Sequence, residues 1–403
     1  MDISTALEEL HLNNYDEAAA LFKDAAAGGN SDACDFIVQI YRLGLSSRVT
    51  RKDALEYAIK GYEYRSKDGC YNLGTMYRTG FLGSPDYAKA YDFFTEGSSE
   101  LHDPRCFFEL GEMLRLGETG KGSSVDEAVK YYHAAAARGY YPAQFQLACI
   151  FERVVKDFET TLEFYRSSAE KGYVDAMLRL GYIYEKGIRV DPDPSAAVDW
   201  YRKASDAGSS AGFLKIARMV LCSADMKNRL QIAPVDLEKQ LTELVEKGSD
   251  PAEPLYLLGC LAEMVGKYGS AGSFFYRSAL KGCLPALCRY AALQIEHGDH
   301  LNTDGDSEDP VDAGSSLRLC NRTEAYALLH VVRITASSMT ESARKYEYLM
   351  SSERIIDTAD RLLSDIHPTL SDEEIAEAGR IADERIGQMF GIQDASSASA
   401  TRS

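Results

Sequence analysis

Three arginines recur at a spacing that would place them on one side of a row of helices. Arg42, Arg78 and Arg115 lie 36 and 37 residues apart, each five residues after a large aliphatic residue. Because a guanidinium group presents a planar set of donors that matches a carboxylate, three stacked arginines predict a partner-binding site for an acidic peptide or a chain terminus. The alternative is a solvated flank on which they pair with neighbouring Asp and Glu side chains. The equivalent positions of the next two units hold Glu152 and Glu185, so the sign of the charge reverses there.

No other group of side chains predicts chemistry. Asp304, Asp306 and Glu308 are spaced like the ligands of a calcium-binding loop, but Ser315 stands where such a loop needs a glutamate. No nucleophile stands beside a general base in a known motif, and no phosphate-binding or dinucleotide-binding motif is present. The sequence therefore predicts no catalytic residue, no metal site and no cofactor.

The arginines belong to a sequence repeat that carries two markers, one in each of two expected helices. The first marker is usually a large aliphatic residue followed by a small one, and it begins at Ile37, Leu73, Leu110, Leu147, Leu180, Ile216, Leu258 and Tyr290. The second is usually an aromatic pair, and it begins at Leu21, Tyr57, Phe93, Tyr131, Phe164, Trp200, Gln240 and Phe274. Both markers keep nearly the same spacing, which predicts tandem helical hairpins. Neither helix of a hairpin could bury its apolar face alone, so the units must stack into a solenoid.

Glycines close many of the expected helices. Glycines that follow a second helix, and so can adopt the left-handed C-cap conformation, are Gly139, Gly172, Gly208, Gly248 and Gly282. Others that end first helices in the same way are Gly44, Gly80, Gly117 and Gly187. These positions predict where each helix stops.

The unit at residues 176–208 resembles a Sel-1-like repeat, a branch of the tetratricopeptide-like superfamily. The residues that carry the resemblance are Ala176, Leu180, Gly181, Tyr184, Gly187, Ala197, Trp200, Tyr201, Ala204 and Gly208. The likeness extends over about residues 15–390. It implies an all-α fold, a right-handed α/α superhelical solenoid, and a scaffold or adaptor that binds other proteins along a concave face.

The expected organisation has five parts. They are a capping hairpin at 1–30, a repeat array at 31–297 that is degenerate at 212–265, an acidic flexible loop at 298–322, a terminal repeat helix with C-terminal capping helices at 323–390, and a disordered tail at 391–403. Ser371 stands before an acidic first turn and is expected to be the N-cap of the last helix.

Composition narrows the class of protein. The net charge of -18 disfavours nucleic acid and anionic membranes, whose phosphates would repel the chain. No run of about 18 apolar residues predicts a membrane span, and the first residues lack the basic region and apolar core of a secretory signal. The nine cysteines are odd in number and show no paired framework, which fits inert packing in a reducing cytoplasm.

The leading hypothesis is a non-catalytic scaffold or adaptor in the cytoplasm of a bacterium, working in signalling, secretion or regulation. Its partners would be proteins or peptides, acidic ones among them. One alternative is an enzyme that binds or hydrolyses β-lactams, as proposed for cysteine-rich relatives of the repeat family. Those relatives pair cysteines seven residues apart in each repeat, and this chain lacks that pairing. Another alternative is a host-directed effector that acts by binding.

Overall fold

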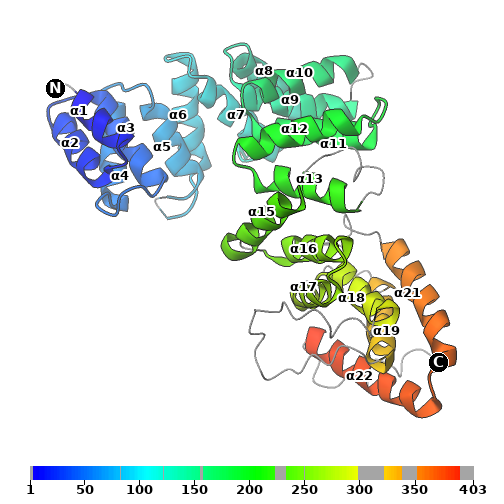
Figure 1. The fold of residues 1–403 in the computed structure, drawn as a ribbon. Helices are drawn as coiled ribbons and strands as arrows, with labels where there is room; N and C mark the ends of the chain where they lie inside the picture. Colours follow the sequence, from blue (N-terminus) through cyan, green and yellow to red (C-terminus); the bar gives the residue numbers. More distant parts are fainter. Residues whose placement is uncertain are drawn as a thin grey trace. The chain divides into compact units, whose positions relative to one another are not determined.

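The computed structural model describes residues 3–81, 83–120, 122–154, 158–222, 233–248, 250–297, 322–337 and 352–390. Within these ranges every regular element is a helix (Figure 1). The predicted all-α solenoid of helical hairpins is confirmed. The acidic residues of the candidate calcium loop and the expected C-terminal tail lie outside the described residues.

The chain divides into two compact units, unit 1 (Met1–Trp200) and unit 2 (Tyr201–Ser403). Unit 1 begins with α1 (Ser4–His11) and continues with alternating second and first helices of successive repeats. They are α2 (Tyr15–Ala27), α3 (Ser31–Arg42), α4 (Arg51–Glu63), α5 (Gly69–Arg78), α6 (Tyr87–Ser99), α7 (Pro104–Leu116), α8 (Val125–Ala136), α9 (Tyr141–Val154), α10 (Phe158–Glu170) and α11 (Val174–Lys186). The boundary between the units falls within α12 (Pro194–Asp206).

Unit 2 continues the succession of antiparallel helices. Its helices are α13 (Ser210–Cys222), α15 (Pro234–Lys247), α16 (Ala252–Met264), α17 (Tyr268–Leu280), α18 (Leu284–Glu296), α19 (Arg322–Ser337), α21 (Ser352–Ile366), the short 3-10 helix η1 (His367–Thr369) and α22 (Asp372–Phe390). Ser371 caps α22 as predicted, because its hydroxyl accepts the Glu374 amide (3.3 Å) while the Glu374 carboxylate accepts the Ser371 amide (2.8 Å). Among the described helices, none combines the length and the apolar character needed to span a bilayer.

The two sequence markers keep the same spacing because they touch each other. A Cβ built on Gly111 of α7 would lie 2.7 Å from Cε1 of Tyr132 on α8, and one on Gly259 would lie 2.6 Å from a ring carbon of Phe275. The small residue of the first helix therefore leaves room for the aromatic ring of the second helix. Tyr132 is fully buried in this contact.

The glycine caps are confirmed with one exception. Positive φ angles occur after the second helices at Gly29, Gly139, Gly172, Gly208 and Gly282, and after first helices at Gly44, Gly80, Gly117 and Gly187. The prediction for Gly248 is wrong, since its φ of -78° and ψ of 146° are extended. Its amide already bonds to the Leu244 carbonyl at 2.8 Å, and the chain then leaves α15 in an extended direction that needs no left-handed residue.

Candidate functional site

Ion pairs join the first helix of one repeat to the first helix of the next. Arg78 on α5 pairs with Glu109 on α7, and Glu152 on α9 receives the Arg179 guanidinium of α11, with Nε 3.0 Å from Oε2. In each pair, one residue lies five positions after a first marker, and the other lies one position before the next marker. Unit 2 uses the same two positions in the pair between Glu263 of α16 and Arg289 of α18. We call these the inter-repeat charge pairs.

The three predicted arginines have different surroundings. Arg78 has a side chain only 18% exposed, because it is enclosed by Glu109 and by Glu118 at 2.7 Å. Arg115 pairs with Glu112 of its own helix at 2.6 Å. Arg42 is exposed, and no ion pair involves it in the described part of the chain.

The register of the charge pairs explains these differences. The residue that precedes the next marker is Glu109 for Arg78, but it is Asn72 for Arg42 and Gln146 for Arg115. An amide cannot neutralise a guanidinium group, so Arg42 and Arg115 lack the inter-repeat partner that Arg78 has. The sequence contains both partners of this pair, but they belong to different repeats and stand 31 positions apart. A comparison of equivalent positions from one repeat to the next therefore does not reveal the pair.

A second set of charges lies where α3, α5 and α7 meet. Asp35 accepts hydrogen bonds from the Ser66 hydroxyl (2.9 Å), the Asp68 amide (3.2 Å) and the Asn72 side chain (3.3 Å). Burial and the nearby Asp68 carboxylate raise the pKa of Asp35 to about 6. Sequence reasoning missed this carboxylate, which has no counterpart in the repeat markers.

Arg105 connects this acidic group to an aromatic side chain. Its guanidinium donates to Asp68 at 2.5 Å and to Asp103 at 2.7 Å, and it lies 4.5 Å from the centre of the Tyr71 ring. Burial raises the pKa of Tyr71, and the positive charges of Arg42 and Arg105 partly oppose this. Arg42 therefore lies within electrostatic range of Tyr71.

An aromatic row continues along the N-terminal ends of α7, α9 and α11. The centre of the Phe108 ring lies 5.3 Å from that of Tyr140, and Tyr141 lies 5.7 Å from Tyr173. Tyr173 also contacts Phe145 at 5.2 Å. Tyr141 is 38% exposed. Two of the tyrosines directly follow a closing glycine, which is the sequence signal that the marker analysis did not use.

The cysteine thiols fit the predicted packing role. Burial raises the pKa of Cys34 and of Cys70 to about 11, and it raises the pKa of Cys106 still further. A thiol that stays protonated at neutral pH is a poor nucleophile. No disulfide joins the cysteines whose side chains the structure describes, and no group of metal-ligating side chains occurs among the described residues.

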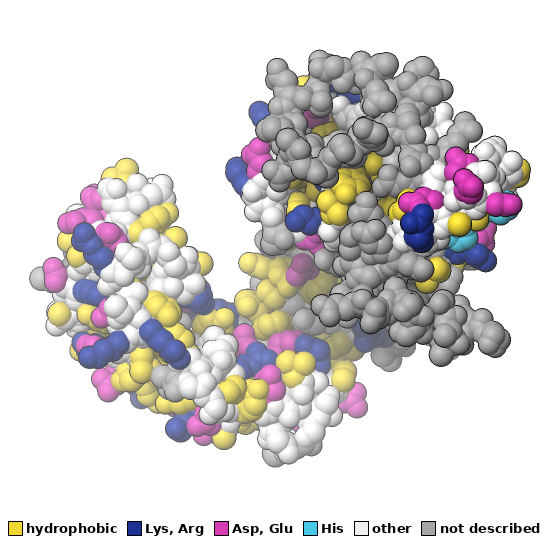
Figure 2. Space-filling model, turned by 90° about the horizontal axis from the view of Figure 1, so that it is seen from below, with side chains coloured by type: hydrophobic (Ala, Val, Ile, Leu, Met, Phe, Trp, Pro, Cys, Tyr) yellow, Lys and Arg dark blue, Asp and Glu magenta, His cyan; other side chains and the backbone are white. Residues whose placement is uncertain are grey.

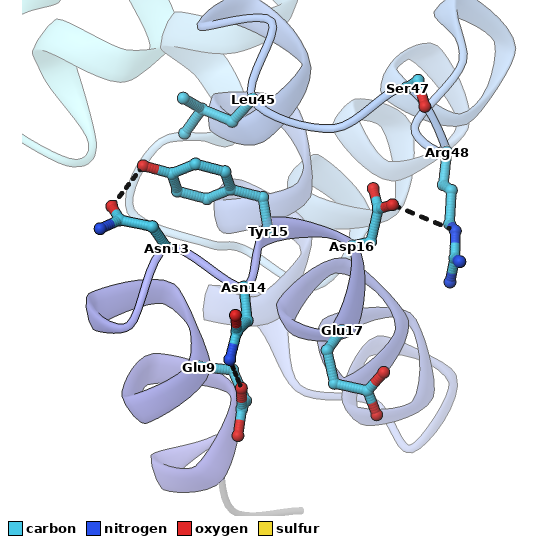
Figure 3. Close-up of a pocket in the computed structure, with 9 residues that line it drawn as sticks. All are labelled: Glu9, Asn13, Asn14, Tyr15, Asp16, Glu17, Leu45, Ser47 and Arg48. Atoms are coloured by element: carbon cyan, nitrogen blue, oxygen red, sulfur yellow. Dashed lines mark hydrogen bonds and ion pairs between the residues drawn. The ribbon is translucent and has the colours of Figure 1, made fainter.

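An open hollow at the start of unit 1 is held together by its own polar groups (Figure 3). Its volume is about 650 Å³, between the α1–α2 turn and the α3–α4 loop. The Tyr15 hydroxyl donates to Asn13 (2.5 Å), the Asn14 amide donates to Glu9 (2.7 Å), and Asp16 pairs with Arg48 (3.3 Å). The Asp16–Arg48 pair joins α2 to the loop, and the other two contacts lie within the α1–α2 region. Together they use most of the polar groups that a ligand would need.

The repeat architecture is also found in known proteins. A family model for the Sel1 repeat matches residues 67–100, 108–140, 142–173 and 174–209. The chain contains four Sel1 repeats. The matched ranges run from the start of α5 to the end of α12. They therefore include the first helices α5, α7, α9 and α11, which carry the charge pairs and the aromatic row of unit 1.

A solved structure shows the same fold, and two others are similar over part of the chain. A protective antigen of uropathogenic Escherichia coli with the Sel1-like repeat fold is 18% identical, covers 94% of this chain and 82% of its own, and has a TM-score of 0.53. A Sel1 repeat protein from Oxalobacter formigenes is 25% identical over 54% of this chain and 89% of its own, with a TM-score of 0.46. An immunity protein from Pseudomonas aeruginosa is 22% identical over 49% and 75%, with a TM-score of 0.39.

Proposed function

We propose that the chain is a non-catalytic scaffold that binds a protein partner along the first helices α3, α5, α7, α9 and α11 of unit 1. The observation that carries this proposal is the series of contacts between successive first helices: the Asp35–Asn72 hydrogen bond between α3 and α5, and the inter-repeat charge pairs and aromatic contacts from α5 to α11. Because these contacts fix the helices against one another, side chains on them lose little further freedom when a partner binds. The repeat fold, which is that of protein-interaction scaffolds, supports the same function.

Two side chains on these helices are suited to contact a partner. Arg42 is exposed with no ion pair in the described residues, and Tyr141 is 38% exposed. Arginine and tyrosine are enriched among the residues that contribute most to protein interfaces. Arg42 would accept a carboxylate of the partner, and Arg115, whose side chain is 34% exposed, would add a second cation. Arg78 would act indirectly, by holding α5 against α7.

The surface of the N-terminal helices does not favour a large partner of a single charge. On the face drawn in Figure 2, basic and acidic side chains are interspersed with apolar ones over the N-terminal helices, at the left of the view. A partner that matches this surface would be a folded protein or an extended peptide of mixed charge. We propose a cytoplasmic location and a role in bacterial signalling, secretion or regulation.

A comparison of two double variants tests the proposal. Arg42→Gln with Tyr141→Ser alters the first helices, and Lys130→Gln with Tyr87→Ser alters second helices at equally exposed tyrosines, since Tyr87 is also 38% exposed. Each tagged chain is used to capture proteins from the native organism, and these are identified by mass spectrometry. The proposal expects a protein that the wild type and the second-helix variant retain and the first-helix variant loses. Equal capture by all three chains would contradict it.

A further inference from the structure

A small pocket opens where α4, α5 and α6 meet. It is lined by Tyr62, Cys70, Glu96, Glu100 and Leu101, among others, and its volume is about 230 Å³. Pockets that hold drug-sized molecules measure about 300–1,000 Å³. This pocket, which we call the Glu96 pocket, therefore has room for a single side chain and not for a larger metabolite.

The Glu96 pocket has an excess of negative charge. Its carboxylates are Glu63, Glu96 and Glu100, and its one cation, Arg65, lies 3.7 Å from Glu100 with a side chain 82% exposed. In the part of the chain that the structure describes, no lysine or arginine lies within ion-pair distance of Glu96 or Glu63. The Glu96 carboxylate accepts the Tyr62 hydroxyl at 2.9 Å and 3.1 Å, which leaves most of its acceptor capacity unused.

The two turns beside the pocket hold residues that are unusual for their conformation. Arg65 follows α4 with a φ of 52°, and His102 follows α6 with a φ of 53°. Other second helices of unit 1 are followed at this position by glycine, as at Gly139 and Gly172. The left-handed conformation is unfavourable for a residue with a Cβ atom. Arg65, which lines the pocket, and His102, which follows the lining residue Leu101, thus carry side chains where other repeats have none.

We propose that the Glu96 pocket receives an arginine side chain of a protein partner. This inference rests on the scaffold function proposed above, and it names one contact of the partner. A guanidinium group matches the carboxylate of Glu96 in shape and charge, and the half-buried Tyr62 ring offers it a cation–π contact. Leu101, which is 40% exposed, would cover the aliphatic stem of the arginine.

Charge complementarity selects against other side chains. An acidic side chain would add a charge to a pocket that already holds three carboxylates, and an apolar side chain would desolvate Glu96 without pairing it. Lysine carries the right charge, but it lacks the planar fork that binds a carboxylate through two hydrogen bonds. Arginine is therefore the preferred occupant, and the experiment must distinguish arginine from lysine.

The test is a titration of the full chain, labelled with ¹⁵N, with the peptide acetyl-Gly-Arg-Gly-amide. The same peptide with citrulline, which keeps the shape of arginine and removes its charge, is the first control. We expect the arginine peptide to shift the amide signals of Tyr62, Cys70 and Leu101, the lysine peptide to shift them less, and the citrulline peptide to leave them unchanged. Equal shifts with citrulline, or no shifts at these amides, would overturn the proposal.

Two double variants each replace two glutamates, one pair at the pocket and the other pair on α10, so that both lose the same amount of negative charge. Glu96→Gln with Glu100→Gln alters the pocket, and the side-chain amide introduced at position 96 can still accept the Tyr62 hydroxyl through its carbonyl oxygen. Glu163→Gln with Glu170→Gln alters exposed positions of α10. Binding of the arginine peptide should weaken about tenfold in the pocket variant and stay unchanged in the α10 variant. Equal weakening in both variants would show that attraction to the net charge alone explains binding.

The outcome is separable from that of the scaffold proposal. If the peptide fails to bind while capture of a partner still depends on Arg42 and Tyr141, the pocket inference is wrong and the scaffold proposal stands. If the peptide binds in the pocket while no partner depends on the first helices, the scaffold proposal is wrong as stated and the pocket remains a binding site.

Discussion

Asp35 should make the packing of α3 against α5 depend on pH. Its carboxylate is partly buried beside Asp68, and these two causes, burial first, raise its pKa from 3.8 to about 6. Between these two values the folded chain holds a proton that the unfolded chain has released. The stability from this group is therefore complete below about pH 4 and is lost as the pH rises through about 6.

The magnitude follows from the two pKa values. With 3.8 in the unfolded chain and about 6 in the folded chain, ionisation of Asp35 costs about 1 kcal/mol at about pH 4.5 and about 3 kcal/mol at about pH 8. The difference of about 2 kcal/mol is an upper limit, because part of the side chain is in contact with solvent. Solvent screening reduces the expected difference to about 1 kcal/mol.

The variant Asp35→Asn removes the titrating group. It also changes the hydrogen bonds that the side chain accepts from Ser66 and from the Asp68 amide, and the free-energy cost of that change is the same at every pH. We therefore expect the free energy of unfolding of the variant, relative to wild type, to rise by about 1 kcal/mol between about pH 4.5 and about pH 8. The dependence of this difference on pH isolates the charge from the hydrogen bonds.

Hydrogen exchange of the α3 and α5 amides is the suitable assay, because a repeat array opens locally and does not unfold in one step. Variant and wild type are compared at the same pH, so the intrinsic exchange rate cancels. Asp32→Asn is the control, since Asp32 is exposed on the first turn of the same helix and its charge contributes least to the raised pKa of Asp35, so that only a much smaller trend is expected. If the difference between Asp35→Asn and wild type is the same at both pH values, or if Asp32→Asn shows the same trend, the assigned burial and repulsion at Asp35 are wrong.

Three further substitutions test the packing, the turns and the charge pairs. Gly111→Ala should lower the free energy of local unfolding of α7 and α8 by about 2 kcal/mol, because the new Cβ would lie 2.7 Å from the Tyr132 ring. Gly379→Ala, whose new Cβ would have no atom within 4 Å, should raise the free energy of local unfolding of α22 by up to about 1 kcal/mol; hydrogen exchange of the amides of these helices measures both. His102→Gly should raise the free energy of local unfolding at the end of α6 by about 0.5–1 kcal/mol, since glycine adopts the φ of 53° without a steric cost, and faster hydrogen exchange of the α6 and α7 amides in the variant would contradict this. Glu152→Gln should speed hydrogen exchange in α11 by an amount equivalent to about 1–2 kcal/mol, because it removes the charge that holds the next first helix; unchanged exchange there would show that this pair does not stabilise the array.

The packing between helices was readable from the sequence because it repeats. A glycine of the first marker lies against an aromatic ring of the second helix at Gly74, Gly111 and Gly259, so Gly111 and Tyr132 recur with the same spacing as their counterparts in these repeats. Both residues of such a contact lie within one repeat, so the contact recurs with the period of the sequence and can be recognised from it. The fold class and the positions of most helix ends followed from it, with the extended Gly248 as the exception.

The surroundings of the arginines were not readable in the same way. The pairing of Arg78 with Glu109 joins two neighbouring repeats, and the two residues occupy different positions within the repeat. A comparison of the single position five residues after the first marker shows only that arginine is replaced by glutamate in later repeats. Asp35 is harder still, because its raised pKa depends on burial and on the distance to Asp68, and neither follows from spacing.

The charge pairs also fix the order of the units. Arg78 and Glu109 pair in one sign, whereas Glu152 and Arg179 pair in the opposite sign at the same two positions. Exchanging the repeats that carry these pairs would place like charges against each other, which is unfavourable between partly buried groups. The alternation of sign therefore specifies which repeat follows which, although all repeats share one packing pattern. Arg42 has Asn72 at the position where this scheme would place an acid, so its charge remains available to a partner in place of a neighbouring repeat.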